Sequence, residues 1–250
     1  MPCKKWTFIA ANIIISLFSQ SVLAIDNWHP ILAFSAGAAF SNPGESKNIP
    51  AHDGIFSFYH YDASDSSHAR FLGGLFLGAE FLLQPEHLSL QAGLSYYQPV
   101  SFTLTGEVTQ GADVSSENQY SYQYDIQSQQ VLIESKLLYN VQHYHPYLTA
   151  GIGAVFNRSQ NFEVDIDPPF TTFSNQFKDN TVTSFMYRIG LGIDIDIAKQ
   201  TRLGLGYRFA DLGKTKTGHG VIDTVSTNNT LSQSRLYSNE ILAQLTIIVM

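Results

Sequence analysis

The residues of this sequence best suited to metal binding or catalysis are three regularly spaced histidines and one serine–histidine pair. His52, His60 and His68 recur every eight residues, and imidazole is a common metal ligand. No cysteine, paired histidine or carboxylate stands beside them at metal-site spacing, so we interpret them as polar loop residues and predict no metal site. Ser67 and His68 are adjacent, but neighbours in a strand point to opposite faces. The sequence has neither a G-x-S-x-G nor an H-E-x-x-H motif, and we expect no catalytic residues.

A second set consists of ten charged residues within otherwise apolar segments, on the side opposite the apolar positions. Five are basic and five are acidic, so the set is neutral. We expect these side chains to form a network of ion pairs, with the lining of a small pore as the alternative. The ten residues are Arg70, Glu80, Glu134, Lys136, Arg188, Asp194, Asp196, Arg202, Arg208 and Glu240.

Composition limits the classes of protein to consider. Of 250 residues, 14% are charged, against about 25% in an average soluble domain, and 13% are aromatic. This balance excludes a disordered chain, a charged coiled coil and a collagen-like polymer. The formal net charge of −7 argues against a nucleic-acid partner, which requires a basic face. A mean hydropathy of −0.04 argues against a bundle of membrane helices.

Residues 1–24 have the pattern of a secretory signal peptide. Two lysines precede the apolar run Trp6–Phe18, and small residues follow up to Ala24. We predict cleavage between Ala24 and Ile25, with a retained membrane anchor as the alternative. The remaining domain, residues 25–250, contains no cysteine, and its net charge changes from −7 to −9 because both lysines leave.

The rest of the chain shows the two-residue hydrophobic period of β-strands. From Phe185 to Ile197 every odd position is apolar. Eight such segments centre near residues 36, 76, 93, 136, 152, 191, 206 and 244, and the gaps between them alternate between long and short. Short turns at one end and long loops at the other are typical of bacterial outer-membrane barrels. We therefore predict an all-β, eight-stranded, antiparallel up-and-down transmembrane β-barrel with short periplasmic turns and four long extracellular loops.

The connections have distinct compositions. His143 and His145 fall in a predicted short turn and are interpreted as polar loop residues. Pro99 predicts a bulge where its strand leaves the membrane. The predicted long loops are polar and comprise Asn42–Ser67, Gly106–Asn118, Asn157–Thr181 and Gly213–Ser232.

The polar face of the strands decides which side meets lipid. A soluble barrel with apolar residues inside is the alternative arrangement. The polar face also carries glycines, among them Gly190, Gly192, Gly204 and Gly206, which would make room for long side chains inside a narrow barrel. Turning this face to lipid would cost about 2–4 kcal/mol for each Arg or Lys near the midplane. We therefore place the charges in the lumen and the apolar residues against lipid.

Aromatic residues of the apolar face gather near both ends of the strands, as expected of the girdles of membrane barrels. The predicted girdle residues are Phe40, Phe71, Phe81, Tyr96, Tyr139, Phe156, Phe185, Tyr187, Tyr207 and Phe209.

Two stretches also resemble a known family. Residues 145–157, HPYLTAGIGAVFN, resemble a strand of the opacity-protein-like outer-membrane β-barrels, and residues 187–214 are similar to the family's penultimate hairpin, including GYRFADLG. The likeness is good over residues 145–214 and architectural before them. It implies a surface-exposed, antigenic barrel of the Gram-negative outer membrane without catalytic residues. The chain departs from the family at Met250, where such barrels usually carry an outward-facing aromatic residue that the assembly machinery reads.

Together these features predict a non-enzymatic outer-membrane barrel without a cofactor. It would serve envelope integrity or act as a surface antigen or adhesin, since loops on a rigid scaffold usually carry function. The expected partners are outer-membrane lipid and lipopolysaccharide, the barrel-assembly machinery, and a host or surface ligand of the loops. The alternatives are a narrow porin-like pore and a lipid-A-modifying enzyme that would use Ser67 and His68.

Overall fold

A computed structural model describes the chain in eight stretches, which together contain strands, turns and short connections. The described residues are 28–41, 44–50, 58–64, 69–83, 87–110, 119–165, 175–222 and 224–249. No helix within these stretches is both long and apolar enough to cross a membrane. Several predicted features lie outside the described residues, namely Ala24, Ile25, His52, Ser67, His68 and Met250.

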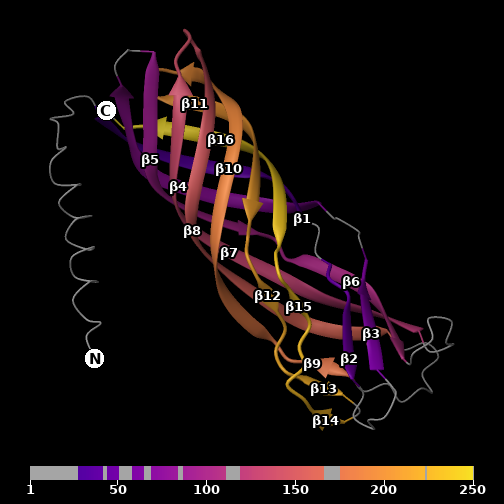
Figure 1. The fold of residues 1–250 in the computed structure, drawn as a ribbon. Coiled ribbons are helices and arrows are strands. Elements are labelled where there is room, and N and C mark those ends of the chain that lie inside the picture. The colour runs from indigo at the N-terminus through magenta and orange to yellow at the C-terminus, as the bar shows by residue number, and fades with distance from the viewer. Residues whose placement is uncertain are drawn as a thin grey trace, which may run out of the picture.

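Eight long strands form a closed antiparallel ring (Figure 1). Each strand pairs with the next, and the last returns to the first with Ala36 opposite Ala243. All eight predicted segment centres lie within these strands, so the prediction of an eight-stranded barrel is confirmed. In ring order the strands are β1 (Trp28–Ser41), β4 (Ala69–Leu83), β5 (Leu88–Pro99), β7 (Gln119–Tyr139), β8 (Tyr144–Asp165), β10 (Asn180–Ala198), β11 (Thr201–Asp211) and β16 (Tyr237–Ile248).

Short turns close one end of the barrel. β10 passes into β11 through a two-residue turn, with Ala198 opposite Thr201. Between β7 and β8, Gln142 takes a positive φ of 55° and Val141 bridges to Tyr144. β8 begins at Tyr144, so His145 is a strand residue, and its prediction as a polar loop histidine is wrong.

The opposite end does not consist of simple polar loops. β7 and β8 continue as paired strands as far as Ser121 opposite Asp165, well beyond the predicted loop start at Asn157. Three further strands extend this sheet from β7, so much of the predicted loop sequence is β-structure. We call this part the extension; its sheet adds β6 (Phe102–Gln110), β3 (Phe58–Ala63) and β2 (Lys47–Pro50), beside the short strands β9 (Gln176–Phe177), β12 (Thr215–Lys216), β13 (Gly220–Ile222), β14 (Val225–Ser226) and β15 (Ser232–Gln233).

A bulge at Pro99 separates the barrel wall from the extension. Tyr97 lies opposite Gln130, whereas Phe102 lies opposite Ile126. Five steps along one strand therefore match four along the other, which is the extra residue of a β-bulge. The bulge reverses the sheet face of the even-numbered positions. Leu94 and Tyr96 are exposed before Pro99, whereas Phe102 and Leu104 are buried after it.

The extension has an apolar core of its own, which explains why these segments fold. Tyr61 packs edge-on against Tyr122 and Phe177, with ring centroids 5.4 and 5.7 Å apart. Phe162 packs edge-on against Phe177 at 4.9 Å. Alternation along each strand sends these rings to one face of the sheet and polar residues to the other. The prediction of polar loops missed this core, although Tyr61, Phe162 and Phe177 fall within the predicted loop ranges.

The barrel wall has the predicted orientation, with apolar side chains outside. Phe185, Leu191 and Leu205 are 68%, 58% and 59% exposed, whereas Arg188 in the same wall is 1% exposed. Exposed apolar side chains in such number mark a surface that meets lipid.

Candidate functional site

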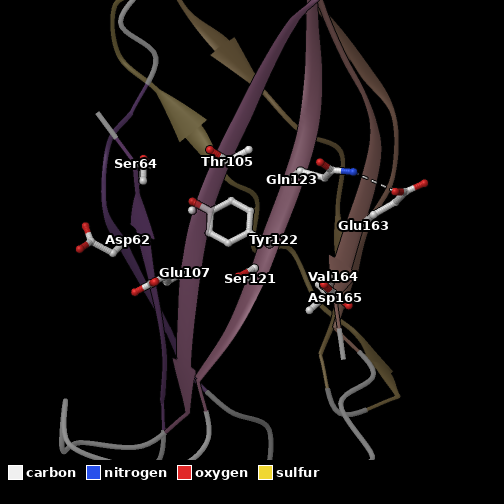
Figure 2. A pocket seen from close by; sticks show the side chains of 12 residues that line it. Asp62, Ser64, Thr105, Glu107, Ser121, Tyr122, Gln123, Glu163, Val164 and Asp165 are labelled. Carbon is white, nitrogen blue, oxygen red and sulfur yellow. Dashed lines mark hydrogen bonds between the residues drawn. The ribbon is translucent and has the colours of Figure 1, made fainter. Parts of the chain in front are cut away.

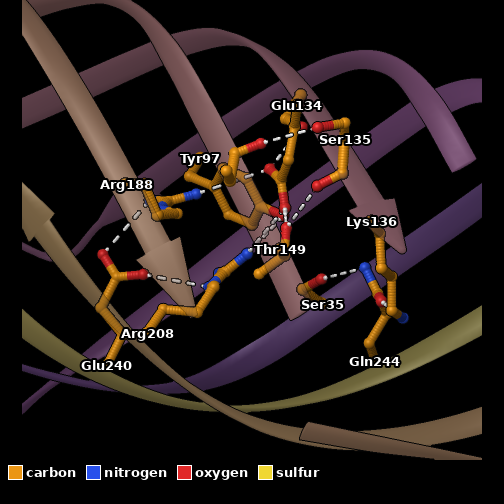
Figure 3. Close-up of polar contacts among 12 residues, drawn as sticks. Ser35, Tyr97, Glu134, Ser135, Lys136, Thr149, Arg188, Arg208, Glu240 and Gln244 are labelled. Carbon is orange, nitrogen blue, oxygen red and sulfur yellow. Dashed lines mark hydrogen bonds and ion pairs between the residues drawn. The ribbon is translucent and has the colours of Figure 1, made fainter. Parts of the chain in front are cut away.

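A ring of alternating charges lies inside the barrel, built from β7, β10, β11 and β16 (Figure 3). Arg188 places its guanidinium 3.3 Å from Glu240 and 3.8 Å from Glu134. Arg208 approaches the same two carboxylates, at 3.4 and 3.6 Å. Each arginine thus contacts both glutamates, and the two positive charges balance the two negative ones, as burial of charge requires.

Tyr97 completes this cluster. The guanidinium carbons of Arg188 and Arg208 lie 4.2 and 4.3 Å from the centre of its ring, in cation–π contact. Arg208 also donates a hydrogen bond to the Tyr97 hydroxyl at 2.7 Å. The sequence prediction did not include Tyr97. Strand parity was an available signal, because Tyr97 alternates with the outward-facing Tyr96.

A second cluster lies nearer the short turns. Lys136 Nζ is 2.6 Å from Asp194 and donates a second hydrogen bond to Gln244 at 2.9 Å. It also lies 3.9 Å from the centre of the Tyr147 ring. The glycines opposite make room for this tyrosine, since a Cβ at Gly192 would lie 2.5 Å from its hydroxyl oxygen.

The third cluster lies at the short-turn end of the lumen. Arg202 bridges Glu80 at 2.6 Å and Asp196 at 3.0 Å. His145 Nε2 lies 3.0 Å from the other oxygen of Asp196, and its Nδ1 is 2.9 Å from the Asn140 side-chain oxygen. His145 is 4% exposed and therefore belongs to the lumen network.

Nine of the ten predicted charged residues thus lie in these three clusters. Arg70 lies apart from them. It donates a hydrogen bond to Thr103 at 3.3 Å, and Thr103 donates one to Asp125 at 2.9 Å, at the base of the extension. Within the described residues, no ion pair joins Arg70 to the other nine.

An apolar layer covers the charged clusters on the side of the extension. It consists of fully buried side chains, namely Leu72, Leu132, Val155, Met186 and Leu212. Beside Glu134, Lys136 and Arg208 the lumen holds a cavity of 10 Å³, enough for about one water molecule. Side chains therefore fill the lumen of the described barrel.

The predicted girdle residues all lie at least partly exposed on the barrel wall. Phe71, Tyr139 and Phe185 are 59%, 51% and 68% exposed. Phe209 is half-buried because it stacks on Tyr237, with ring centroids 5.6 Å apart. The predicted girdle also includes Phe40, Phe81, Tyr96, Phe156, Tyr187 and Tyr207, of which Phe40 and Phe81 are half-buried.

A hollow of 760 Å³ lies on the polar face of the extension, over β3, β6, β7 and β8 (Figure 2). One row of the sheet crosses it, with Asp62 opposite Glu107, Glu107 opposite Ser121 and Ser121 opposite Asp165. In the next row Gln123 donates a hydrogen bond to Glu163 at 3.1 Å. The described lining of this hollow contains four carboxylates and no lysine or arginine. We call this feature the acidic hollow.

The back of the same sheet is apolar. Burial raises the pKa of Tyr122 and of Tyr124 above the ordinary value for tyrosine, so both hydroxyls stay neutral. Lys47 lies opposite Tyr61 on this back face and donates a hydrogen bond to the Thr230 carbonyl, whereas the carboxylates of the acidic hollow lie on the other face.

The predicted histidine set is described only at His60, whose Nδ1 lies 2.5 Å from the Asn48 side-chain oxygen. The described part of the chain contains no group of three or more His, Cys, Asp or Glu side chains arranged to hold a metal ion.

The closed ring, its apolar outer wall and its filled polar lumen define an outer-membrane β-barrel. The chain belongs to the outer membrane protein beta-barrel domain family, whose model matches residues 29–234. This match confirms the expected membership in an outer-membrane β-barrel family, and it indicates the Gram-negative outer membrane as the location.

Several solved structures of outer-membrane proteins are similar to this chain at low sequence identity. The outer membrane protease OmpT from Escherichia coli matches with a TM-score of 0.50 and 10% identity, over 88% of this chain and 96% of that chain. Neisserial surface protein A matches with a TM-score of 0.43 and 16% identity, over 88% of this chain and 98% of that chain. Ail from Yersinia pestis matches with a TM-score of 0.33 and 11% identity, over 87% of this chain and 99% of that chain. No curated protein matches the sequence.

Proposed function

We propose that this protein is a non-enzymatic, adhesin-like surface protein that binds a basic partner through the acidic hollow. The observation that carries the proposal is the hollow itself, with four carboxylates and no lysine or arginine in its described lining. Asp62 and Glu107 are direct cross-strand neighbours, an arrangement that is unfavourable for like charges. Lysine or arginine side chains of a partner would relieve this repulsion.

The extension is suited to such a role because its sheet is rigid. Aromatic side chains packed edge-on on the opposite face hold the strands in place. Binding to the carboxylates therefore does not have to order a flexible loop, which would cost conformational entropy. The lumen serves a different purpose in this proposal. Its ion-pair clusters are structural and close the barrel, while the girdle holds the barrel in lipid.

The proposal is tested with the full protein reconstituted in phosphatidylcholine vesicles and a fluorescein-labelled deca-lysine peptide as probe. Asp62→Asn combined with Glu107→Gln is expected to weaken binding at least tenfold at low salt. Binding to the unaltered protein should fall steeply as salt rises, because exposed charges are screened within about 10 Å at 0.1 M.

The control removes two carboxylates from the same extension outside the hollow, through Glu45→Gln combined with Asp179→Asn. Both side chains are exposed, and this variant should bind the peptide about as well as the unaltered protein. Equal losses in the two variants would show attraction by net charge alone and would contradict a site in the hollow.

A further inference from the structure

A second hollow lies outside the barrel, where β10, β11 and β16 reach the extension. It has a volume of 430 Å³, and its lining includes Phe185, Tyr187, Lys214 and Arg235. The first two side chains belong to the aromatic girdle, and the last two are cations. We call this feature the basic hollow.

The backbone around Lys214 is fixed in a specific form. Gly213 has a φ of 66°, and a Cβ there would lie 2.6 Å from that of Ser184. Asn157 donates a side-chain hydrogen bond to the Lys214 carbonyl at 2.9 Å. The Ser184 hydroxyl contacts the same carbonyl and the Lys214 amide, both at 3.2 Å. The lysine therefore projects from an ordered turn.

Asp211 joins the two sides of the basic hollow. One of its oxygens accepts a hydrogen bond from the Gly213 amide at 2.9 Å, and the other accepts one from Arg235 at 3.0 Å. The Asp211 side chain is 6% exposed, whereas that of Arg235 is 60% exposed. The carboxylate is thus covered, while one guanidinium and one ammonium face outward, which leaves a net positive surface.

The position of the basic hollow identifies its environment. Phe185 is 68% exposed on the apolar wall, and the stacked pair Phe209 and Tyr237 lies on the neighbouring strands. Lys214 and Arg235 follow at the ends of those strands, where β11 and β16 give way to β12 and β15 (Figure 1). Cations directly beyond an aromatic girdle lie at the depth of the lipid head groups.

We propose that the basic hollow binds a phosphate group of an outer-leaflet glycolipid, with the acyl chains lying along the aromatic wall below. Arginine and lysine are the side chains that recognise phosphate, and a pair of them held by the fold gives a defined site. A comparable hollow of 500 Å³ near Phe71 and Tyr96 has no charged residue in its described lining. Both hollows are lined by aromatic side chains of the barrel wall, but only the basic hollow also has two cations.

The test is native mass spectrometry of the detergent-solubilised, folded full chain titrated with bisphosphorylated lipid A. The unaltered protein is expected to retain one lipid A. Lys214→Gln combined with Arg235→Gln should reduce retention at least fivefold. Lipid A stripped of its phosphates should bind the unaltered protein as weakly as intact lipid A binds the variant, and free inorganic phosphate should not displace the lipid.

The matched control is Arg158→Gln combined with Lys178→Gln, which removes two exposed cations of the extension. Arg158 also pairs with a carboxylate, Asp179, at 3.3 Å. This control should retain lipid A like the unaltered protein. Equal retention in the Lys214 and Arg235 variant, or an equal loss in the control, would overturn the proposal. Displacement by inorganic phosphate would show a free-anion site instead. Heat-dependent mobility on SDS gels establishes that each variant is folded.

Discussion

At the scale of single residues, the lumen shows how a membrane barrel tolerates buried charge. Arg188 has a fully buried side chain, yet it contacts Glu134, Glu240 and the face of Tyr97. It also donates a hydrogen bond to Gln130. Removing one member of such a cluster is more damaging than the modest net strength of an ion pair suggests, because its partners stay buried without compensation.

Arg188→Met should therefore lower the free energy of unfolding by about 3–5 kcal/mol, the usual cost of breaking a buried pair. Urea titration of the protein folded in lipid vesicles measures this change. Arg158→Met is the control, because its ion pair with Asp179 has both side chains 52% exposed and should contribute only about 0–1 kcal/mol. Similar losses in the two variants would contradict a structural role of the lumen cluster.

At the scale of elements, the extension is a folded unit that continues from the barrel strands. β7 and β8 run without interruption from the membrane wall into the extension. The bulge at Pro99 reverses the strand face, so apolar positions that follow it, such as Phe102 and Leu104, enter a core. Phe177 in the short strand β9 is 6% exposed and contacts the rings of Tyr61 and Phe162.

Phe177→Ala should loosen the extension while the barrel stays folded. Loss of a buried phenylalanine costs about 3–5 kcal/mol, and here the loss falls on a small local core. Proteinase K digestion of the reconstituted protein should cut the extension at least tenfold faster and leave a protected barrel with heat-dependent mobility. Phe185→Ala, on the lipid face, should leave the cleavage rate unchanged. Loss of the protected barrel in the Phe177 variant would show that the two parts unfold together.

At the scale of the whole molecule, the described structure is a barrel whose lumen is filled by side chains and whose one end continues into the extension. Three charged clusters and an apolar layer occupy the lumen, and a cavity beside Glu134 has room for about one water molecule. Small barrels of this strand number have interiors that side chains can fill. The arrangement favours a structural lumen over a pore.

The folded protein should therefore show no stepwise conductance in a planar bilayer at any applied voltage that the bilayer withstands. A trimeric porin added to the same bilayer provides the positive control, and protease protection of the inserted barrel establishes that it is present. Reproducible current steps from the protein alone would support the pore alternative and contradict the plugged lumen.

The sequence was sufficient to predict the barrel, because alternation of side chains is a local property of each strand. The period of two from Phe185 to Ile197, together with alternating gap lengths, predicted eight antiparallel strands with charges inside. The same parity predicts inward positions for Tyr147 and His145, which the predicted set of ten charged lumen residues does not contain.

Which charged residues meet, and where the chain folds beyond the membrane, depended on the tertiary structure. Ion pairs such as Arg202 with Glu80 join residues 122 positions apart, and their geometry depends on the stagger between strands. The aromatic core of the extension and the approach of Lys214 to Arg235 likewise arise from pairing between distant segments. The sequence by itself determined which face each strand residue takes, because parity is local. Only the tertiary structure decided which residues share a site, because strand register and closure are properties of the whole barrel.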